Sequence, residues 1–589
     1  MQWVVPDTVH PDAEALARAL DLPPLIGRLL CQRGYETPEA ARRFLDGALT
    51  ELPDPFLLKD MDVAVARLER ALAQRERICV VSDYDVDGLT STALLVRVLT
   101  RLDASVVTYA PHRVKDGYGF SEKAVAFAKG QGASVLITVD SGTTAHAALA
   151  YACEEQVDVL VVDHHELQAL ARPPAHALIN PLQSDCPYPE KALASVGLAF
   201  KLAQALLSQR SQRGQTHRGL TPSALWEHLD LVCLGTVADV APLVGENRVL
   251  VRYGLQRLAA TPKAGLKALM AVADVRPGPL TTEHVGFILG PRINAAGRMS
   301  APDSALRLLV TDDAAEAKTL AAALHEENRV RQRVEQAVLR EALEQVARTV
   351  DFTQHRVIVV AGQGWHPGVI GIVAARLVER YARPAVVIAL ADGVGKGSAR
   401  SIAGFHLVDA LAECRERLAG FGGHEMAAGL TIAAEQVAGF REALNAVARR
   451  RLADDQLVPQ LSVDAEVSLA TMTPAFMRAL ERLGPFGAGN RRPVFVSHGV
   501  TFHAAPQSRG RAGLHCWVRE GNGPVFECSG FDRAERWRDR LVTLDGPFSL
   551  AYSPTLSAWR GEPGVMLQIK DVQEAAAVAR QPVEVTRLS

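Results

Sequence analysis

Four short apolar runs alternate with helix-length segments in the N-terminal half of the chain, and this alternation restricts the fold more than any other feature. The runs are ICVVSDYD, ASVVTYAP, SVLITVDSG and DVLVVDHH. Uninterrupted Val and Ile runs separated by helices indicate a parallel β-sheet covered on both faces. We therefore predict an α/β domain, and in such domains ligands bind at the carboxyl ends of the strands.

Acidic and histidine residues stand where three of these runs end, and one more acid follows a helical stretch that begins near Leu225. They are Asp83, Asp85, Asp87, Asp140, Asp163, His164, His165 and Asp239. Carboxylates this close disfavour one another's ionisation and are costly to bury unless a cation pairs with them. Oxygen and imidazole ligands without thiolates favour Mn²⁺ or Mg²⁺, and a set this large predicts two ions about 3.5 to 4 Å apart. Such a pair suits hydrolysis at phosphorus.

Each of these residues also has a purely structural interpretation. A lone Asp at a strand end is more often a helix cap, and Asp87 before Gly88 is suited to that role. A histidine pair is more often a hydrogen-bonded surface or core feature than a ligand set. Four clusters in order at predicted strand ends are harder to explain as caps, so we favour a metal site.

The pattern changes beyond Pro302. Residues 312–350 contain no Pro or Gly and predict one helix of roughly 58 Å that connects two lobes. A second α/β unit follows, with strands RVIVVAG and AVVIAL and the glycine-rich loops GVGKGSARS and FGGHEMAAG. After about Asp455, five or six short strand signals predict a small barrel.

Composition limits the setting. The 589 residues include 64 Lys and Arg against 66 Asp and Glu, so the chain as a whole lacks a basic signature of nucleic-acid binding. Eight cysteines without a CxxC pair fit neither a disulfide framework nor a zinc knuckle, and they predict a reducing, cytoplasmic environment. No apolar run approaches the roughly 18 residues of a membrane span, so no membrane association is predicted.

Ten segments carry a resemblance to a known family. VSDYDVDGLTS, VDSGTT, VVDHHE and GTVADVAPL, in that order, resemble the four motifs of the DHH phosphodiesterase superfamily. PHRVKDGYGF, GPRINAAGRMS, GWHPGVIGIVAARL, GKGSARS, FGGHEMAAGL and PFGAGNRRPVF resemble the RecJ family of bacterial single-strand-specific 5′→3′ exonucleases. The similarity covers roughly Arg77 to Val572. It implies an α/β fold with a parallel-sheet DHH domain and a second α/β DHH-associated domain joined by a long helix, plus a C-terminal β-barrel of the OB-fold type.

The pattern and the resemblance together predict six segments. They are an N-terminal extension packing on the DHH domain (1–76), the DHH catalytic domain (77–311), the connecting helix (312–350), the DHH-associated domain (351–455), the OB-fold (456–575) and a C-terminal tail (576–589).

The resemblance also implies roles for the acidic and histidine residues. The metal ligands it implies are Asp83, Asp85, Asp87, Asp140, His164 and Asp239, with Asp140 as the bridging carboxylate and Asp85 and Asp87 favoured over Asp83 as direct ligands. Asp163 is expected to orient His164 through a hydrogen bond, and His165 to face the reacting phosphate as electrophile or proton donor. Relatives that cleave pyrophosphate or small dinucleotides carry a histidine where this chain has Val81, which leaves the ligand set of one metal open.

Substrate-binding residues are expected on both lobes. They are Arg113, Arg292, Asn294, Arg298, Ser398, Arg400, Gly422, Gly423 and His424. Of these, Arg113, Ser398 and Arg400 are predicted to grip a 5′-terminal phosphate through charge-assisted hydrogen bonds. Phe495, Trp517 and Trp559 of the barrel are candidates for stacking on unpaired bases, with packing in the barrel core as the alternative for each.

These features predict a single-stranded-DNA-specific 5′→3′ exonuclease that uses two Mn²⁺ or Mg²⁺ ions and releases 5′-mononucleotides in DNA repair and recombination. One alternative is a nanoRNase or cyclic-dinucleotide phosphodiesterase, although such relatives lack the long helix and the barrel. The other is an inactive DNA-binding scaffold, although that lineage has lost metal ligands that this chain retains. The expected partners of this monomeric enzyme are single-stranded DNA with a 5′ end, a helicase and a single-strand-binding protein.

Overall fold

The structure, a computed structural model, describes residues 1–6, 10–112, 119–167, 172–509, 513–530, 546–559 and 562–574. The chain divides into two compact units. The first contains Met1–Glu51, Pro242–Gly245 and Pro459–Ser589, and the second contains Leu52–Ala241 and Glu246–Val458. Among the described residues, no helix combines the length and the apolar character that a membrane span requires.

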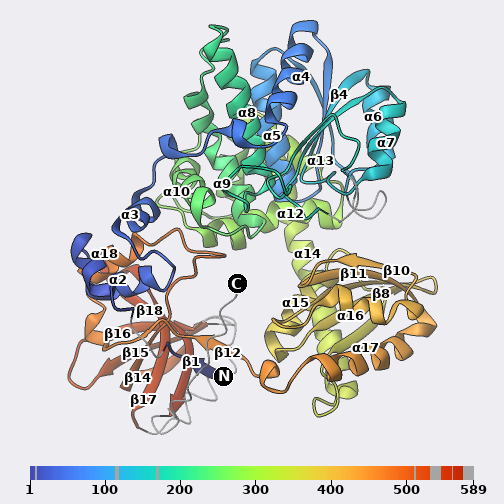
Figure 1. The fold of residues 1–589 in the computed structure, drawn as a ribbon. Helices are drawn as coiled ribbons and strands as arrows, with labels where there is room; N and C mark the ends of the chain where they lie inside the picture. The colour runs from blue at the N-terminus through green and yellow to red at the C-terminus, as the bar shows by residue number, and fades with distance from the viewer. Residues whose placement is uncertain are drawn as a thin grey trace. The chain divides into compact units, whose positions relative to one another are not determined.

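The second unit contains the parallel sheet that the apolar runs predict (Figure 1). Its strands are β2 (Arg77–Val81), β3 (Ser105–Tyr109), β4 (Ala133–Val139), β5 (Asp158–Val162) and β6 (Ala177–Ile179). All neighbours are parallel, in the order β3-β2-β4-β5-β6. The chain moves outward from β2 in one direction to β3 and then crosses back to β4, so the crevice at the carboxyl ends of β2 and β4 is the topological switch point where ligands bind.

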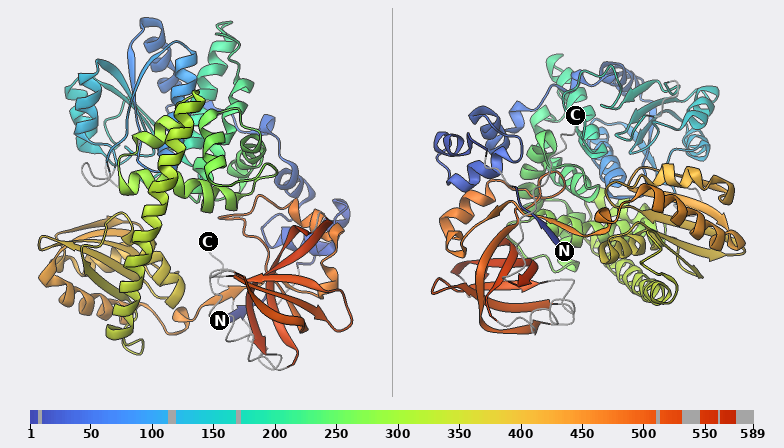
Figure 2. Two further views of the ribbon diagram at one scale, coloured as in Figure 1. Left: turned by 180° about the vertical axis from the view of Figure 1, so that it is seen from behind. Right: turned by 60° about the horizontal axis from the view of Figure 1, so that its bottom comes forward.

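Helices cover both faces of this sheet, and further helices pack on those helices. In chain order the helices are α4 (Met61–Gln74), α5 (Val86–Arg101), α6 (Glu122–Gly130), α7 (His146–Glu154), α8 (Ser195–Gln212), α9 (Leu229–Ala238), α10 (Gly245–Ala259), α11 (Ala264–Val272), a π-helix (His284–Leu289), α12 (Gly290–Met299) and α13 (Asp303–Val310). Helices α6 and α7 pack on one face of the sheet and bury a core with the strands. Helices α5 and α8 pack on the other face, as the two views of Figure 2 also show.

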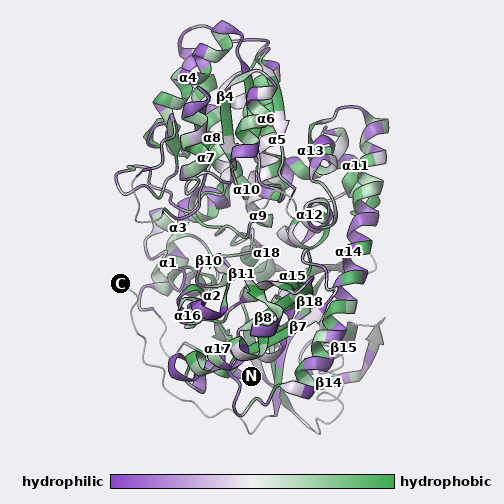
Figure 3. Ribbon diagram, turned by 90° about the vertical axis from the view of Figure 1, so that its right-hand side faces the viewer, coloured by the Kyte–Doolittle hydropathy of each residue, from purple (hydrophilic) through white to green (hydrophobic). Residues whose placement is uncertain are grey.

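A long helix, α14 (Ala314–Thr349), leads from this domain to the second lobe of the unit. Asp313 caps it, accepting hydrogen bonds from the backbone N–H groups of Ala315 and Glu316. Its 36 residues span about 54 Å at the rise of an α-helix. Hydrophilic and hydrophobic residues mix along its length in Figure 3, as expected for a helix that is buried on one side only.

The second lobe is a mixed five-stranded sheet in the order β10-β11-β9-β8-β7. The strands are β7 (Ile358–Gln363), β8 (Ala385–Ala391), β9 (Val394–Arg400), β10 (Gly420–Gly423) and β11 (Ala427–Ala433), and the helices are α15 (Ile370–Tyr381), α16 (Leu407–Glu413) and α17 (Val437–Arg451). Asp392 and Gly393, both with positive φ, form the two-residue turn between β8 and β9.

The first unit contains a closed barrel. Strands β14 (Phe495–Arg509), β15 (Gly513–Glu520), β16 (Phe526–Gly530), β18 (Glu562–Glu574) and β17 (Phe548–Trp559) pair in that order, and β17 pairs with β14 to close the ring. Short β13 (Ala465–Glu466) adds to β14, and β1 (Gln2–Val4) pairs with β12 (Gln460–Ser462). Together with the two α/β lobes and α14, this barrel confirms the predicted fold class.

The N-terminal helices pack differently from the predicted domain layout. Helices α1 (Ala13–Ala19), α2 (Pro24–Cys31) and α3 (Pro38–Asp46) share one hydrophobic core with α18 (Pro474–Glu481) and the barrel strands. Residues 1–51 therefore belong to the barrel unit, so the prediction that 1–76 packs as a whole on the DHH domain is wrong for them. Their amphipathic patterns require an apolar partner but carry no information on which one.

Candidate metal centre

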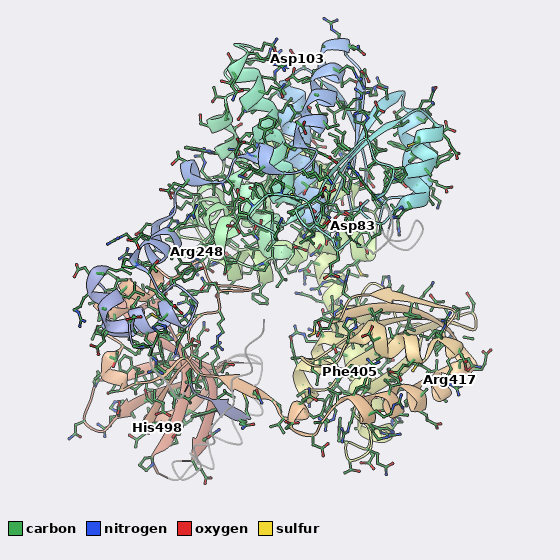
Figure 4. The ribbon with its side chains drawn as sticks, in the orientation of Figure 1. Asp83, Asp103, Arg248, Phe405, Arg417 and His498 are labelled. Atoms are coloured by element: carbon green, nitrogen blue, oxygen red, sulfur yellow. The ribbon has the colours of Figure 1, made fainter. Side chains whose placement is uncertain are left out.

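The first acidic motif connects β2 to α5. Asp85 caps α5, since its Oδ1 accepts hydrogen bonds from the N–H groups of Asp87 and Gly88 at 2.9 and 3.2 Å. The structural role considered for Asp87 thus belongs to Asp85. Figure 4 places Asp83 and Asp103 at opposite ends of the domain, as expected for one residue that follows a parallel strand and one that precedes the next.

Asp87 is fully buried against the N-terminus of α8. Its two carboxylate oxygens accept hydrogen bonds from the N–H groups of Ser195 and Val196 at 2.8 and 2.9 Å. Burial and the neighbouring Asp85 raise the pKa of Asp87 to about 7, although these hydrogen bonds favour the charged form. The first turn of α8 therefore holds this carboxylate in place through its backbone.

Asp140 follows β4 with a left-handed backbone, φ 60°. Its Oδ1 accepts a hydrogen bond from Ser195 Oγ at 3.1 Å and lies 3.3 Å from His164 Nε2. Burial and the surrounding carboxylates raise the pKa of Asp140 well above its ordinary value; these carboxylates are Asp85, Asp87, Asp83 and Asp239. So crowded a set of buried acids requires a compensating positive charge.

Three overlapping groups of side chains are arranged so that their ligand atoms lie within 4.8 Å of one another. The groups are Asp83, Asp85 and Asp140; Asp87, His164 and Asp239; and Asp140, His164 and His165. All the predicted ligand positions are thus brought together, and Asp140 and His164 are each shared by two groups. A single ion would not use so many ligands, so the overlap fits two ions that share ligands.

The environment of His164 indicates whether a cation fits this cluster of side chains. Its Nε2 is buried and makes no hydrogen bond within the described part of the chain. Burial, reinforced by the nearby His165, lowers the pKa of His164 to about 4, so near neutral pH its ring is uncharged and able to donate a lone pair to a metal. With carboxylates and no thiolate beside it, this donor set suits Mn²⁺ or Mg²⁺.

Asp163 contacts the ring of His165, which corrects the expected contact with the ring of His164. Asp163 Oδ1 lies 2.7 Å from His165 Nδ1 and accepts the backbone N–H of His164 at 2.8 Å, while Oδ2 accepts the N–H of Thr143 at 3.0 Å. The carboxylate folds back on its own turn, which brings the second imidazole rather than the first within reach. Although burial opposes it, the bond to His165 holds the pKa of Asp163 well below its usual range.

His165 is the positively charged member of the site. Burial would lower its pKa, but the bond to Asp163 and the other carboxylates prevail and raise the pKa of His165 to about 9. Asn180 Nδ2 donates to the carbonyl of His165 at 2.9 Å and to Thr143 Oγ1 at 3.1 Å. The imidazolium is therefore held in one orientation and can donate a proton or a hydrogen bond to an anion.

Asp239 ends α9, where burial and the carboxylates of Asp87 and Asp85 raise its pKa to about 9. The next residue, Val240, has φ 63°, a conformation that is strained for a β-branched side chain. The chain thus turns sharply at the residue that follows Asp239.

Residues of the second lobe approach this cluster. The His424 ring lies 6.5 Å from the His165 ring, nearly parallel to it, and its Nδ1 lies 3.9 Å from Glu166 Oε2. Gly422 and Gly423 lie in the exposed strand β10 just before His424. Of the glycine-rich FGGHEM segment, the structure therefore places His424 near the predicted catalytic histidine.

Ser398 and Arg400 lie together at the N-terminus of α15. Arg400 donates to Ser398 Oγ at 3.3 Å, and a Cβ atom added to Gly371 in the first turn would lie 2.9 Å from that Oγ. Arg298 donates to the carbonyl of Gly368, just before α15, at 3.3 Å. The N-terminus of α15, the Ser398 hydroxyl and the Arg400 guanidinium together form a site suited to an anion.

The other predicted substrate contacts have structural partners or lie outside the description. Asn294 Oδ1 accepts the N–H of Val86 at 3.2 Å, and Arg292 donates to the carbonyl of Ile288 at 2.6 Å and to His325 Nδ1 at 3.3 Å. Arg113 lies outside the described residues. Their roles toward substrate stay predictions.

The stacking candidates of the barrel fare differently. Phe495 is fully buried and packs against Phe476 and Tyr552, so its assignment to base stacking is wrong: its strand turns this side chain into the core. Trp517 is partly exposed and meets the His515 ring edge-on at 4.6 Å between centroids. The side chain of Trp559 lies outside the description.

Sequence reasoning missed Ser195, Thr143 and Asn180, which hold the site residues in place. Ser195 contacts both Asp87 and Asp140, and Thr143 and Asn180 support the DHH turn. Thr143 belongs to the VDSGTT motif and Asn180 directly follows the short strand Ala177–Ile179, but neither side chain is an acid or an imidazole. The signal for Ser195 is the small-residue sequence ALASVG at the start of a long helix.

Comparison with known proteins gives consistent matches along the chain. Residues 77–236 match the DHH family, N-terminal domain; 354–450 match the DHHA1 domain; and 463–571 match the RecJ OB domain. The single-stranded-DNA-specific exonuclease RecJ of Bacillus subtilis is 38% identical over 575 residues, which cover 97% of this chain and 70% of that protein.

Two solved structures extend the match to the whole fold. Thermus thermophilus RecJ in complex with Mn²⁺ superposes with a TM-score of 0.82 at 32% identity, covering 98% of this chain and 80% of that one. The Mg²⁺ complex of the same protein gives a TM-score of 0.77 at 31% identity, covering 98% of this chain and 79% of that one. With near-complete coverage, identity above 30% and all three domains in order, the chain belongs to the RecJ family.

Proposed function

We propose that this chain is a single-stranded-DNA-specific exonuclease, a phosphodiesterase that hydrolyses DNA from its 5′ end. The observation that carries the proposal is the set of overlapping carboxylate and histidine groups at the switch point of the parallel sheet. Its relatives bear the name single-stranded-DNA-specific exonuclease. The completeness of the acidic set argues against an inactive scaffold, and α14 and the barrel argue against an enzyme for dinucleotides.

Two divalent ions, Mn²⁺ or Mg²⁺, would be held by Asp83, Asp85, Asp87, Asp140, His164 and Asp239. When bound, they would supply an activated water and neutralise charge on the phosphate. Asp140, common to two of the three groups, is the proposed bridging ligand. Ser195 Oγ donates a hydrogen bond to its carboxylate at 3.1 Å and so helps to orient it.

His165 is the proposed catalytic residue toward the phosphate. Its pKa of about 9 keeps it protonated near neutral pH, and Asp163 and Asn180 fix its ring and backbone. From this position the imidazolium would donate a hydrogen bond to a phosphate oxygen, or a proton to the leaving oxygen. Asp163 acts by orienting His165, and we assign it no separate contact with substrate.

The 5′→3′ direction would come from the anion site at the N-terminus of α15. A terminal phosphate dianion binds a helix N-terminus, Ser398 and Arg400 more strongly than an internal diester does. Gripping the end there would place the first phosphodiester bond at the metal ions and release 5′-mononucleotides. Arg113 is expected to complete the pocket, His424 to approach the reacting phosphate, and Arg292, Asn294 and Arg298 to line the strand.

The same proposal sets the enzyme's context. It would act as a monomer in DNA repair and recombination, on ends that a helicase unwinds and a single-strand-binding protein covers. The eight cysteines are free thiols, which suits the reducing cytoplasm.

A cleavage assay tests the proposal. The substrates are a 5′-phosphorylated single strand with a 3′ label, the same strand with a 5′ label, and the blunt duplex, each with Mn²⁺. With the single strand, we expect the 5′ label to appear in mononucleotides from the earliest time points and the 3′-labelled strand to shorten progressively. The blunt duplex should give neither result. Release from the 3′ end first, equal cleavage of the blunt duplex, or no cleavage at all would contradict it, and Asp140→Asn serves as the inactive control.

A further inference from the structure

Phe287 is the most exposed large apolar side chain among the described residues, with 80% of its surface accessible. It lies in the π-helix His284–Leu289, directly before α12. π-Helices are rare in proteins and occur frequently at functional sites. An unburied phenyl ring held on such a segment needs an explanation other than core packing.

The helical segment 284–299 runs along the metal centre. At its start, a Cβ atom on Gly286 would lie 3.9 Å from Val237, and one on Gly290 would lie 3.5 Å from Cβ of Ala238, which immediately precedes Asp239. Phe287 therefore lies on a segment that packs against the end of the helix that carries Asp239.

The far end of the same segment supports the first acidic motif. Asn294 accepts the N–H of Val86 at 3.2 Å, and a Cβ atom on Gly297 would lie 2.5 Å from the carbonyl oxygen of Tyr84. Phe287 precedes Asn294 by seven residues, on the order of 10 Å along a helix axis. The segment that carries Phe287 therefore contacts both the motif of Asp83, Asp85 and Asp87 and the helix end before Asp239, where a strand with a phosphate at the metal centre would pass.

We propose that Phe287 is a base-stacking residue, a subsite for one unpaired nucleobase of the strand that is being cleaved. The inference rests on the proposed function, and it places base recognition in the catalytic unit, whereas Phe495 of the barrel is buried in its core. Every base offers a flat π-face, so this contact would hold single strands of any sequence and reject paired bases, whose faces are covered.

Binding measurements separate this role from a structural one. The dissociation constant for a 5′-phosphorylated single strand is measured in EDTA, which prevents cleavage, for wild type, Phe287→Ala, Phe287→Leu, Phe287→Trp and the control Phe56→Ala. Phe56 is a second exposed phenylalanine, in the short helix Pro55–Leu57. Phe287→Ala should weaken binding about 5- to 150-fold, the equivalent of 1 to 3 kcal/mol for one stacked base. Phe287→Trp should retain affinity, Phe287→Leu should behave like Phe287→Ala, and Phe56→Ala should match wild type.

An abasic scan identifies the stacked base. A single abasic nucleotide is moved along the first six positions from the 5′ end. At one position it should weaken wild-type binding by the Phe287→Ala factor and leave Phe287→Ala unaffected, because both changes remove the same contact. In cleavage with Mn²⁺, KM for the variant should rise by a larger factor than kcat falls.

Wild-type affinity in Phe287→Ala, full affinity in Phe287→Leu, or additive losses at every abasic position would overturn the stacking role. Failure of the proposed function has a different signature. In that case wild type itself would neither cleave single strands nor prefer them to duplex, whatever residue stands at position 287.

Discussion

Replacing Asp140 by Asn is expected to weaken metal binding and abolish cleavage without unfolding the protein. Asp140 belongs to two of the three ligand groups, so its loss damages both at once. Asn has nearly the same size and can still accept the hydrogen bond that Ser195 Oγ donates to Asp140 at 3.1 Å. It removes one negative charge from a set of buried carboxylates, which relieves repulsion in the metal-free protein.

The sizes of the two effects follow from the geometry. Two unit charges within the 4.8 Å of a ligand group repel by about 3 to 4 kcal/mol at the effective dielectric constant of protein sites. Partial protonation reduces this figure, so the metal-free variant should be as stable as wild type or up to a few kcal/mol more stable. Wild type at a Mn²⁺ concentration 100 times its dissociation constant should gain about 2.7 kcal/mol per site, roughly 5 to 11 °C in Tm for a domain of ordinary size. The variant should gain less than about 2 °C.

The assay is thermal unfolding of wild type and Asp140→Asn in EDTA and in a Mn²⁺ titration, with single-strand cleavage measured on the same samples. Cleavage by the variant should fall below a few per cent of the wild-type rate at saturating Mn²⁺. Two results would refute the reasoning: a variant that Mn²⁺ stabilises as much as wild type, or a metal-free variant that melts well below wild type. The first would remove Asp140 from the ligand set, and the second would make its role structural.

The crowded acids also predict an unusual pH dependence. An unfolded Asp ionises near pH 4, whereas the folded pKa is about 7 for Asp87 and about 9 for Asp239. Between these values the folded state binds more protons than the unfolded state, so stability falls as pH rises. His165, whose pKa is raised to about 9, contributes in the same direction between roughly pH 6.5 and 9. Metal-free protein should therefore melt at a higher temperature at pH 6 than at pH 8, and saturating Mn²⁺ should flatten or reverse the slope. A metal-free Tm that rises over this interval would contradict the predicted charge distribution.

Three further substitutions test other parts of the structure. Arg400→Ala should reduce the preference for 5′-phosphate over 5′-hydroxyl ends about tenfold without changing Mn²⁺ affinity, with Arg417→Ala of the same lobe as the control; an unchanged ratio would place the 5′ pocket elsewhere. Lys201→Met should lower the free energy of unfolding in urea by about 3 to 5 kcal/mol, because it leaves buried Glu246 without its ion-pair partner. Adding Glu246→Leu to this variant should restore most of the lost stability. Asn490→Ala should lower the free energy of unfolding by about 2 to 4 kcal/mol, because this buried side chain donates hydrogen bonds to two backbone carbonyls. Tryptophan fluorescence during denaturant unfolding of the barrel unit measures this change.

The parts of the fold that sequence reasoning predicted are those that local pattern determines. A parallel strand buried on both faces must be apolar throughout, so β2, β4 and β5 were visible as uninterrupted runs. The residues just after such strands face the ligand crevice whatever the remainder of the chain does. This is why Asp83, Asp140 and His164 could be assigned to one site before any coordinates were known.

The parts of the fold that sequence reasoning did not predict depend on which surfaces pack against each other. The amphipathic helices α1 to α3 could have covered any apolar surface, and the barrel provides it. Phe495 and Phe287 look alike as sequence, yet one is fully buried and the other is 80% exposed. A barrel residue's direction depends on register, and a π-helix follows no simple hydrophobic period, so neither outcome could be derived from spacing.

The supports of the metal centre explain how so many buried acids persist in one place. Asp85 accepts the first N–H groups of α5, and Asp87 accepts those of α8, so two helix N-termini face the cluster with partial positive charge. These bonds are made by backbone, and they do not depend on a bound ion. These two carboxylates are therefore held at their positions by the fold itself, and binding a cation should require little rearrangement of them. Loss of the metal should then leave the fold intact, in contrast to small zinc domains that unfold without their ion.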